Sequence, residues 1–315
     1  MNRPQVAVVG AGAWGTALAL QALRAGAEVT LCARAPLAHG QANPRLPGFP
    51  LPPGLRLAAT PPPGAILLLA VPTQALRDAA AALPPAALLV CCAKGVERGS
   101  LRLPLEILAE TRPDTPSVVL TGPNFAHEVA AGLPAAAVIA GPDPAARATA
   151  TAALASPRFR LYGNEDAIGA QLGGAAKNVI AIAAGAVIGA GLGENARAAL
   201  ITRGLAELAR LAAALGGRAE TMSGLSGLGD LLLTCTGPAS RNFSLGLALG
   251  QGRTLAAVLA ERRAVTEGVA TAPALLARAG AVDLPICRAV AALLAGEVTL
   301  EAAIAALLSR QRRDE

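Results

Sequence analysis

Two lysines are the first candidates for chemistry in this 315-residue chain. Among its 27 basic residues only Lys94 and Lys177 are lysines, and the other 25 are arginines. Lys177 lies in the almost wholly apolar stretch AIGAQLGGAAKNVIAIAAGAVIGAG, residues 167–191. An ammonium can release a proton where a guanidinium cannot, and apolar surroundings lower its proton affinity. Lys177 is therefore a candidate general acid or base, and a lysine that snorkels to water is the alternative.

Polar residues form three islands in the apolar second half of the chain. They offer an ammonium, a carboxylate, a guanidinium and amides, from Lys177, Asn178, Asp230, Ser240, Arg241 and Asn242. Arg241 can hold a phosphate through two parallel hydrogen bonds, and Asp230 can orient the ammonium or accept from a substrate hydroxyl. The set suits a small phosphorylated polar substrate. The alternatives are a helix cap at Asp230 and a solvated loop position for Arg241.

The N-terminal sequence VAVVGAGAWGTALALQALRAG predicts a strand, a glycine-rich turn and a helix. Its G-x-G-x-x-G glycines are Gly10, Gly12 and Gly15. In a dinucleotide-binding turn the first glycine permits the tight turn, the second lets the backbone approach a pyrophosphate, and the third lets helix and strand pack closely. Since the expected second strand follows, we predict dinucleotide binding here, with a purely structural glycine turn as the alternative.

The adenosine end of such a site is recognised at the end of the second strand, where this chain has LCARAP. An acidic residue there would bind the ribose of NAD(H), whereas Arg34 offers a cation to a 2′-phosphate. The sequence therefore favours NADP(H) and leaves NAD(H) open. The alternative for Arg34 is an exposed loop arginine.

Lys94 follows another predicted strand, in LLVCCAKGVE. In an open α/β sheet the carboxyl ends of the strands face the ligand. Lys94 is thus placed to meet an anionic or carbonyl group, unless it is simply exposed in a turn. The next strand ends in LTGPNFAHEV, which brings backbone N–H groups and Asn124 to the same edge.

The elements that must position these residues change character near the middle of the chain. Short β-rich runs alternate with Ala/Leu-rich helical runs up to about residue 165, which predicts a doubly wound parallel sheet with helices on both faces. Residues 43–63 are rich in Pro and Gly and predict a loop at the sheet edge. We therefore predict an α/β Rossmann-type dinucleotide-binding domain over 1–164 and an all-α substrate-binding domain over 165–315. The predicted strands are residues 5–10, 28–34, 65–72, 87–95, 117–124, 135–141 and 159–163.

Composition narrows the class of partner. The net charge is +6 and the sequence pI near 9.6, but the arginines are scattered and not interleaved with aromatic residues. We therefore expect a basic pocket for an anionic small molecule and no nucleic-acid partner. The five cysteines indicate buried thiols in a reducing cytosol, and with only two histidines we expect no metal site.

The stretch 167–191 also approaches the length of a membrane span. It contains Gln171, Lys177, Asn178 and many glycines, so we predict one or two buried core helices. The expectation is a cytoplasmic protein with no stable membrane insertion.

The chain resembles the bacterial NAD(P)-dependent glycerol-3-phosphate dehydrogenases from the first glycine motif nearly to the C-terminus. The Lys-Asn pair at 177–178 and the block GLGDLLLTCT…SRN are the most specific matches. The others are GAGAWGTALA, VPTQ, AKGVE, GPNFAHEVAAGLP, QLGGAAKNVIAIAAG, NARAALITRGLAE and TEGV.

The resemblance implies that Lys177 donates and accepts the proton of the reaction. It implies substrate contacts from Lys94, Gly122, Asp230, Ser240, Arg241 and Asn242. It implies cofactor contacts from Trp14, Arg34, Lys94, Ala126, Arg241, Val265 and Glu267, beside the glycine turn.

Three features depart from the family's pattern. Ala13, in the glycine turn beside the cofactor, stands where the family often has Ser. Asn124, at a position that would contact the substrate, stands where Ser or Thr is usual. The segment 35–47 looks shorter than usual, which affects the adenosine side and not the chemistry.

The expected reaction is the reversible NAD(P)H-dependent reduction of dihydroxyacetone phosphate to sn-glycerol 3-phosphate, the backbone of glycerophospholipids. The resemblance also suggests a homodimer. One alternative is another hydroxy-acid dehydrogenase of the same architecture, which would anchor its substrate without the SRN block. A second is a non-catalytic NADP(H)-sensing protein, which would not need Lys177.

Overall fold

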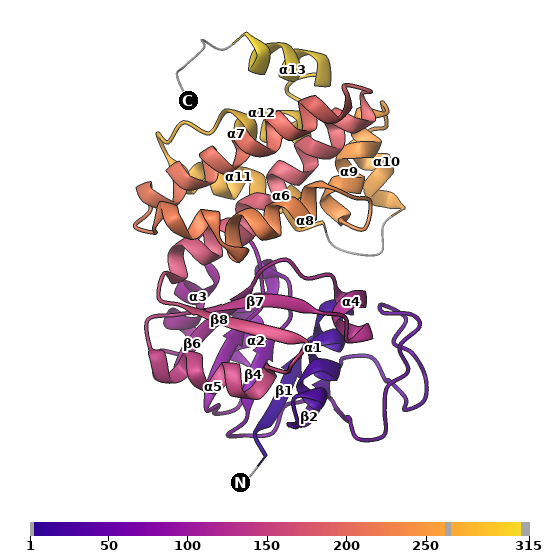
Figure 1. Ribbon diagram of the computed structural model, residues 1–315, viewed down its shortest axis with the longest axis vertical. Coiled ribbons are helices and arrows are strands. Elements are labelled where there is room, and N and C mark those ends of the chain that lie inside the picture. The colour runs from indigo at the N-terminus through magenta and orange to yellow at the C-terminus, as the bar shows by residue number, and fades with distance from the viewer. Residues whose placement is uncertain (1–2, 262–265, 310–315) are drawn as a thin grey trace. The chain divides into compact units, whose positions relative to one another are not determined.

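The computed structural model describes residues 3–261 and 266–309 (Figure 1). The chain divides into two compact units. The first contains Met1–Lys94 and Arg102–Gln171, and the second contains Gly95–Leu101 and Leu172–Glu315. The chain therefore passes from one unit to the other three times.

The first unit is built on a sheet of eight strands in its described part, in the order β3-β2-β1-β4-β5-β6-β7-β8. Apolar runs such as ILLL in β4 and LLVC in β5 are buried along their whole length, as strands covered on both faces must be. The strands are β1 Gln5–Val9, β2 Glu28–Cys32, β3 Arg56–Ala58, β4 Ile66–Leu69, β5 Leu88–Cys91, β6 Ser117–Thr121, β7 Ala135–Ala140 and β8 Phe159–Asn164.

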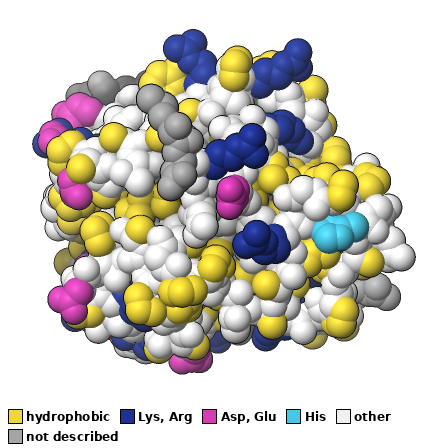
Figure 2. Space-filling view, turned by 90° about the horizontal axis from the view of Figure 1, so that it is seen from below, with side chains coloured by type: hydrophobic (Ala, Val, Ile, Leu, Met, Phe, Trp, Pro, Cys, Tyr) yellow, Lys and Arg dark blue, Asp and Glu magenta, His cyan; other side chains and the backbone are white. Residues whose placement is uncertain are grey.

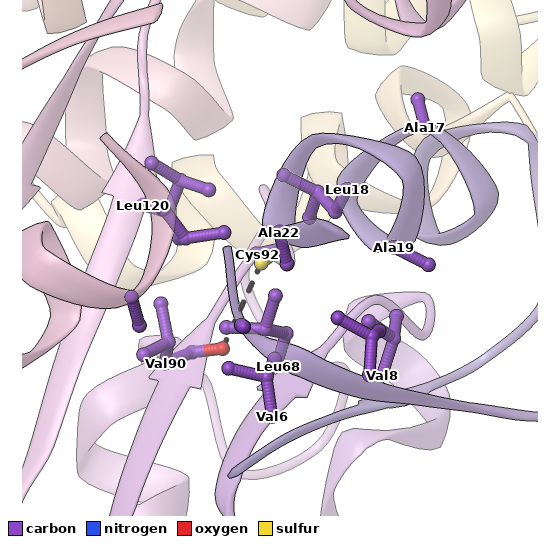
Figure 3. Packing of buried hydrophobic residues seen from close by; sticks show 14 of the residues in the cluster. Val6, Val8, Ala17, Leu18, Ala19, Ala22, Leu68, Val90, Cys92 and Leu120 are labelled. Carbon is purple, nitrogen blue, oxygen red and sulfur yellow. Dashed lines mark hydrogen bonds between the residues drawn. The ribbon is translucent and has the colours of Figure 1, made fainter. Parts of the chain in front are cut away.

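Helices cover both faces of this sheet, which confirms the doubly wound architecture. Val6 and Val8 of β1 pack with the helix α1, whereas Ala7 between them belongs to a second core cluster with α2 and α3. Figure 3 shows Leu18 and Ala22 of α1 over Val6, Val8 and Leu68. The helical segments are α1 Ala13–Arg24, the 3-10 turn η1 Thr73–Ala75, α2 Leu76–Ala81, α3 Pro104–Thr111, α4 Ala126–Ala131 and α5 Pro144–Leu154.

The sheet differs from the sequence prediction in two places. β7 is antiparallel to β6, whereas the other neighbouring pairs are parallel. The connection between them holds only the six-residue α4, too short to cross the sheet, so β7 begins at the edge where β6 ends. The predicted loop 43–63 contains the short edge strand β3, whose three residues carry no readable alternation of apolar side chains.

The second unit is helical, as the sequence predicts, and residues 167–191 are mostly a single helix. This helix, α6, is long and apolar enough to cross a membrane by length and composition, yet 89% of its most apolar window is buried inside the protein. The segments are α6 Ala167–Gly189, α7 Gly193–Ala214, the 3-10 turn η2 Ala219–Ser223, the π-helical η3 Leu225–Gly229, α8 Asp230–Cys235, α9 Arg241–Gly250, α10 Leu255–Ala260, α11 Glu267–Ala279, α12 Pro285–Ala295 and α13 Leu300–Leu308.

Helices α6 and α9 cross at a pair of matched glycines. A Cβ added at Gly185 would lie 2.0 Å from the carbonyl oxygen of Phe243, and one at Gly246 would lie 1.9 Å from that of Ile182. Gly189 and Gly250, one turn further along each helix, are equally tight against the facing backbone. Only residues without a side chain allow this approach, so the crossing fixes where the beginning of α9 lies relative to α6.

The five cysteines are free and buried, as predicted. Burial raises the pKa of the Cys235 thiol to about 12, so this residue next to Thr234 stays a neutral thiol. Within residues 3–261 and 266–309 no group of three His, Cys, Asp or Glu side chains is arranged to hold a metal ion.

Candidate active site

The three motif glycines of the first unit have three different structural roles. Gly10 has φ +105°, a conformation that suits glycine, and a Cβ there would lie 2.7 Å from the carbonyl oxygen of Ala70. A Cβ on Gly15 would lie 1.9 Å from the carbonyl oxygen of Gly10, so helix and turn touch at the backbone. Gly12 has nothing within 4 Å of the same position. The open space lies at the N-cap of α1, where a pyrophosphate would sit, so the turn fits a dinucleotide.

Further predicted cofactor residues of this unit lie at the start of α1, just after β2 and at the start of α4. Ala13 and Trp14 open α1, and both pack partly against the core. Arg34 is exposed, two residues past the end of β2. Ala126 is the first residue of α4, which follows β6. Three separate segments of one unit thus carry these residues, which are proposed to line a dinucleotide.

Lys94 lies at the carboxyl edge of the sheet, beyond the central strand β5. Its Nζ donates a hydrogen bond to the carbonyl oxygen of Gly122, 3.1 Å away, beyond β6. Gly122 has φ +130°, and a Cβ there would lie 3.1 Å from the Cα of Ala137 in β7. The structure therefore brings together two of the predicted substrate residues, and the second must be glycine.

Asn124 lies beside them but is mostly turned toward the protein. Its Nδ2 donates to the carbonyl oxygen of Ala136, 3.1 Å away. Its Oδ1 is buried and has no hydrogen-bond partner among the described residues. The Asn124 amide therefore ties the loop after β6 to β7.

Lys177 and Asp230 form a buried ion pair in the second unit. Lys177 is 7% exposed and Asp230 1% exposed, and the Lys177 Nζ donates to the Asp230 Oδ1. Nζ also donates to Thr234 Oγ1 at 2.9 Å, and that hydroxyl donates to the backbone oxygen of Asp230 at 2.5 Å. The ammonium is thus compensated and oriented by two side chains of α8, and the snorkelling alternative is wrong for this side chain.

A π-helical turn sets the position of Asp230. The segment LSGLG forms η3 and runs directly into α8, whose first residue is Asp230. Its backbone lies against α6, because a Cβ on Gly173 would be 2.4 Å from the carbonyl oxygen of Ser226. Such π turns are rare and often occur at functional sites. This close approach is what brings Asp230 to Lys177 from 53 residues further along the chain.

The SRN block begins helix α9. Ser240 is the N-cap, and its Oγ accepts a hydrogen bond from the backbone N–H of Phe243 at 3.2 Å. Arg241 is the first residue of the helix and is exposed. An exposed guanidinium at a helix N-terminus suits an anion such as phosphate.

Asn242 joins three helices through its side-chain amide. Its Nδ2 donates to Asn178 Oδ1 on α6 at 2.8 Å, and its Oδ1 accepts from the backbone N–H of Gly268 on α11 at 3.1 Å. Glu267 stands in the first turn of that helix and is half-buried. Val265, the remaining predicted cofactor residue, lies outside the described residues.

Sequence reasoning missed two residues that this geometry makes prominent. Thr234 is a hydrogen-bond partner of Lys177, yet nothing in LLLTCT distinguishes it from a helix-packing threonine. Asn43 lies in the predicted loop, but its side chain is 2% exposed and bonds to the glycine turn. For Thr234 the one sequence signal was its spacing of four residues from Asp230, which puts the two side chains on one face of a helix.

Figure 2 shows how the charged side chains lie on one face of the molecule. On the described residues of the face in Figure 2, basic side chains alternate with acidic and apolar ones and do not join into a single stripe. Extended phosphate backbones bind along such stripes. A compact anion needs only a local cation, which Arg241 and Arg34 each offer in their own unit.

Comparison with known proteins covers both units. Residues 5–147 match the family model of the NAD-dependent glycerol-3-phosphate dehydrogenase N-terminus, and residues 166–305 match that of its C-terminus. The glycerol-3-phosphate dehydrogenase [NAD(P)+] of Acidiphilium cryptum is 60% identical, covering 99% of this chain and 98% of its own. That of Gluconobacter oxydans is 54% identical, covering 98% of each.

A solved structure agrees with these relatives. The glycerol-3-phosphate dehydrogenase of Coxiella burnetii superposes with a TM-score of 0.90 at 36% identity, over 98% of this chain and 99% of that one. The chain therefore belongs to the NAD-dependent glycerol-3-phosphate dehydrogenase family.

Proposed function

We propose that this protein catalyses the reversible NAD(P)H-dependent reduction of dihydroxyacetone phosphate to sn-glycerol 3-phosphate, and so supplies the glycerophospholipid backbone. The observation that carries the proposal is the buried Lys177–Asp230–Thr234 cluster, in a chain whose other unit has an open dinucleotide turn at Gly12. The domains divide the work: residues 1–164 bind the dinucleotide and residues 165–315 hold the substrate.

Lys177 is the proposed proton donor in the reductive direction. A nicotinamide held by the first unit would supply the hydride for the C2 carbonyl carbon. Lys177 Nζ donates a hydrogen bond to the carbonyl oxygen and then its proton, and in the reverse direction it accepts the proton from the C2 hydroxyl. Asp230 and Thr234 hold the ammonium in place, and Asp230 balances its charge before the proton moves.

The substrate's phosphate is the part that Arg241 recognises. The helix N-terminus of α9 and the guanidinium both favour a dianion there. Ser240 and Asn242 flank Arg241 and are proposed to complete the phosphate site. In the other unit the proposed substrate contacts are Lys94, Gly122 and Asn124, of which Lys94 is the cation.

The cofactor is proposed to be NADP(H) in preference to NAD(H). Arg34 is exposed at the adenosine end, and the described residues of LCARAP contain no carboxylate that would bind the ribose 2′-hydroxyl. The other proposed contacts, beside the glycine turn, come from Trp14, Lys94, Ala126, Arg241, Val265 and Glu267. We further propose a cytoplasmic homodimer.

The direct test follows coenzyme absorbance at about 340 nm, where the reduced nicotinamide absorbs. Purified protein is given dihydroxyacetone phosphate, or unphosphorylated dihydroxyacetone as the matched control, with NADPH and with NADH. We expect oxidation that requires the phosphate and runs faster with NADPH. Binding of a coenzyme without its oxidation would contradict the proposed reaction, and a preference for NADH would contradict the role of Arg34.

A second experiment tests the contribution of Arg34 to coenzyme binding. The Arg34→Ser variant should bind NADPH about tenfold more weakly and NADH almost unchanged, since a charge-assisted contact to the 2′-phosphate is lost. The control is Arg45→Ser, which changes another exposed arginine between β2 and β3. If both coenzymes weaken equally, Arg34 does not read the 2′-phosphate.

A further inference from the structure

The segment 33–55 is a long stretch between β2 and β3 with a defined conformation. Such segments are usually functional when they are ordered. Two backbone hydrogen bonds close it. The N–H of Gly40 donates to the carbonyl oxygen of Leu51, and the N–H of Leu51 donates to the carbonyl oxygen of Gln41, each at 2.9 Å. Three leucines anchor the segment in the same core cluster as α1: Leu46, Leu51 and Leu55. We call residues 33–55 the adenosine-side loop, because Arg34 stands at its beginning.

Asn43 fastens this loop to the glycine turn. Its Nδ2 donates to the carbonyl oxygen of Ala11 at 3.0 Å and to Thr16 Oγ1 at 2.7 Å. Its Oδ1 accepts from the backbone N–H of Arg45 at 3.0 Å, so every polar atom of the side chain is used within the protein. At 2% exposure the amide has no water to replace these partners.

The two acceptors lie on either side of Gly12. Ala11 precedes it, and Thr16 follows it by one helical turn, where the Thr16 backbone N–H donates to the carbonyl oxygen of Gly12 at 2.9 Å. Asn43 therefore braces the turn at residues on both sides of Gly12, whose own Cβ position is open. A single side chain thus ties the pyrophosphate turn to the loop that carries the cation for the adenosine end.

We propose that Asn43 is a positioning residue that holds the adenosine-side loop and the glycine turn as one unit, so that recognition of the 2′-phosphate depends on it. The inference rests on the proposed function for the identity of the dinucleotide. Asn43 touches neither the substrate cluster nor Lys177, so its loss acts on the affinity for the cofactor and leaves the chemistry alone.

The test measures coenzyme binding without substrate, by isothermal titration of Asn43→Ala with NADPH and NADH at a temperature where urea unfolding shows the variant fully folded. The dissociation constant for NADPH should rise about tenfold or more, and by a larger factor than that for NADH. At saturating NADPH, kcat should stay within about twofold of the wild type, so that the effect falls on cofactor affinity.

Two further variants guard against a general folding defect. Thr16→Val keeps the loop and removes one acceptor of Asn43, so it should raise the dissociation constant for NADPH by a smaller factor, and the double variant should be no weaker than Asn43→Ala alone. Thr149→Val, an exposed hydroxyl on α5, is the matched control and should change nothing.

An unchanged dissociation constant for NADPH in folded Asn43→Ala, or an equal rise for both coenzymes, would overturn the inference. The proposed function fails differently, because wild-type protein would then bind neither coenzyme or would bind one without reducing dihydroxyacetone phosphate. The two failures are therefore distinguishable.

Discussion

The charged ammonium of Lys177 is tolerated in the protein interior because the Asp230 carboxylate lies beside it. Removing either partner of such a pair leaves the other charge without compensation, which is costly in a protein interior. Such a pair adds little to stability, and it suits the proposed role of Lys177 as a holder of a transferable proton. The chain uses arginine almost everywhere else, which agrees with a special demand on this residue.

The Lys177→Arg variant separates charge from proton transfer. A guanidinium keeps the positive charge but does not readily release a proton, so turnover should fall on the order of 10²-fold or more. NADPH affinity should remain at the wild-type value, since the glycine turn belongs to the other unit. The measurement is steady-state kinetics beside coenzyme titration on the same preparation, and near-normal turnover would remove Lys177 from the reaction.

Residue types alone predicted Lys177, Asp230 and Arg241 as candidates, because charged groups in apolar sequence require a reason. The same reasoning could not single out Thr234 or Asn43, which are uncharged. A buried Thr or Asn is recognised only by its partners, and those of Asn43 are 27 and 32 residues away in the chain. Long-range hydrogen bonds leave no periodic trace in the sequence.

At the scale of elements, the α6–α9 crossing determines where Arg241 and Asn242 stand relative to Lys177. The glycines that permit it were visible in the sequence, but glycine in a helix is ambiguous until a partner is known. The sequence predicted an all-α domain over 165–315, but not which two helices would touch at the backbone.

Gly246→Ala tests the crossing. Its Cβ would meet the carbonyl oxygen of Ile182 at 1.9 Å, and helix backbones must separate to admit it. We expect a loss of about 1–3 kcal/mol in the free energy of unfolding, measured with urea, and a raised KM for dihydroxyacetone phosphate. Gly237→Ala is the matched control, because nothing lies within 4 Å of its Cβ position, and it should be neutral or slightly stabilising. Equal stability of the two variants would contradict the crossing.

Glu207 connects α7 to α12 in the same unit. This carboxylate is 1% exposed and accepts hydrogen bonds from the backbone N–H groups of Ile286 at 2.6 Å and Cys287 at 3.2 Å, at the beginning of α12. Burial raises the pKa of the carboxyl above its ordinary 4.5, and the two N–H bonds oppose this shift without cancelling it. Folding therefore shifts this carboxyl toward the protonated form relative to the unfolded chain.

The sign of the pH effect follows. A carboxyl whose pKa is raised on folding contributes stability that is present below its unfolded pKa and lost as the pH rises through its folded pKa. Relative to Glu207→Gln, the wild type should therefore lose stability as the pH rises above about 4.5. Urea midpoints of both proteins across this window test it. A relative gain with rising pH would mean that the N–H groups of α12 outweigh burial.

For the whole molecule, the change from alternating β and helical runs to helices alone predicted the fold class correctly. It did not predict the antiparallel β7, because strand direction depends on the length of the α4 connection and not on the strand's own residues. Nor did it predict that Gly95–Leu101 groups with the helical unit. Those seven residues follow Lys94 and have no periodic pattern that would assign them to either unit.

The proposed reaction uses residues of both units, the dinucleotide turn of one and the Lys177 cluster of the other. The most direct measurement of that claim uses NADPH deuterated at the transferable position and dihydroxyacetone phosphate, with the product analysed by NMR. The account predicts sn-glycerol 3-phosphate with one deuterium at C2 for each coenzyme oxidised. Coenzyme oxidised without deuterium at C2, or dihydroxyacetone phosphate left unconsumed by protein that binds NADPH, would contradict it.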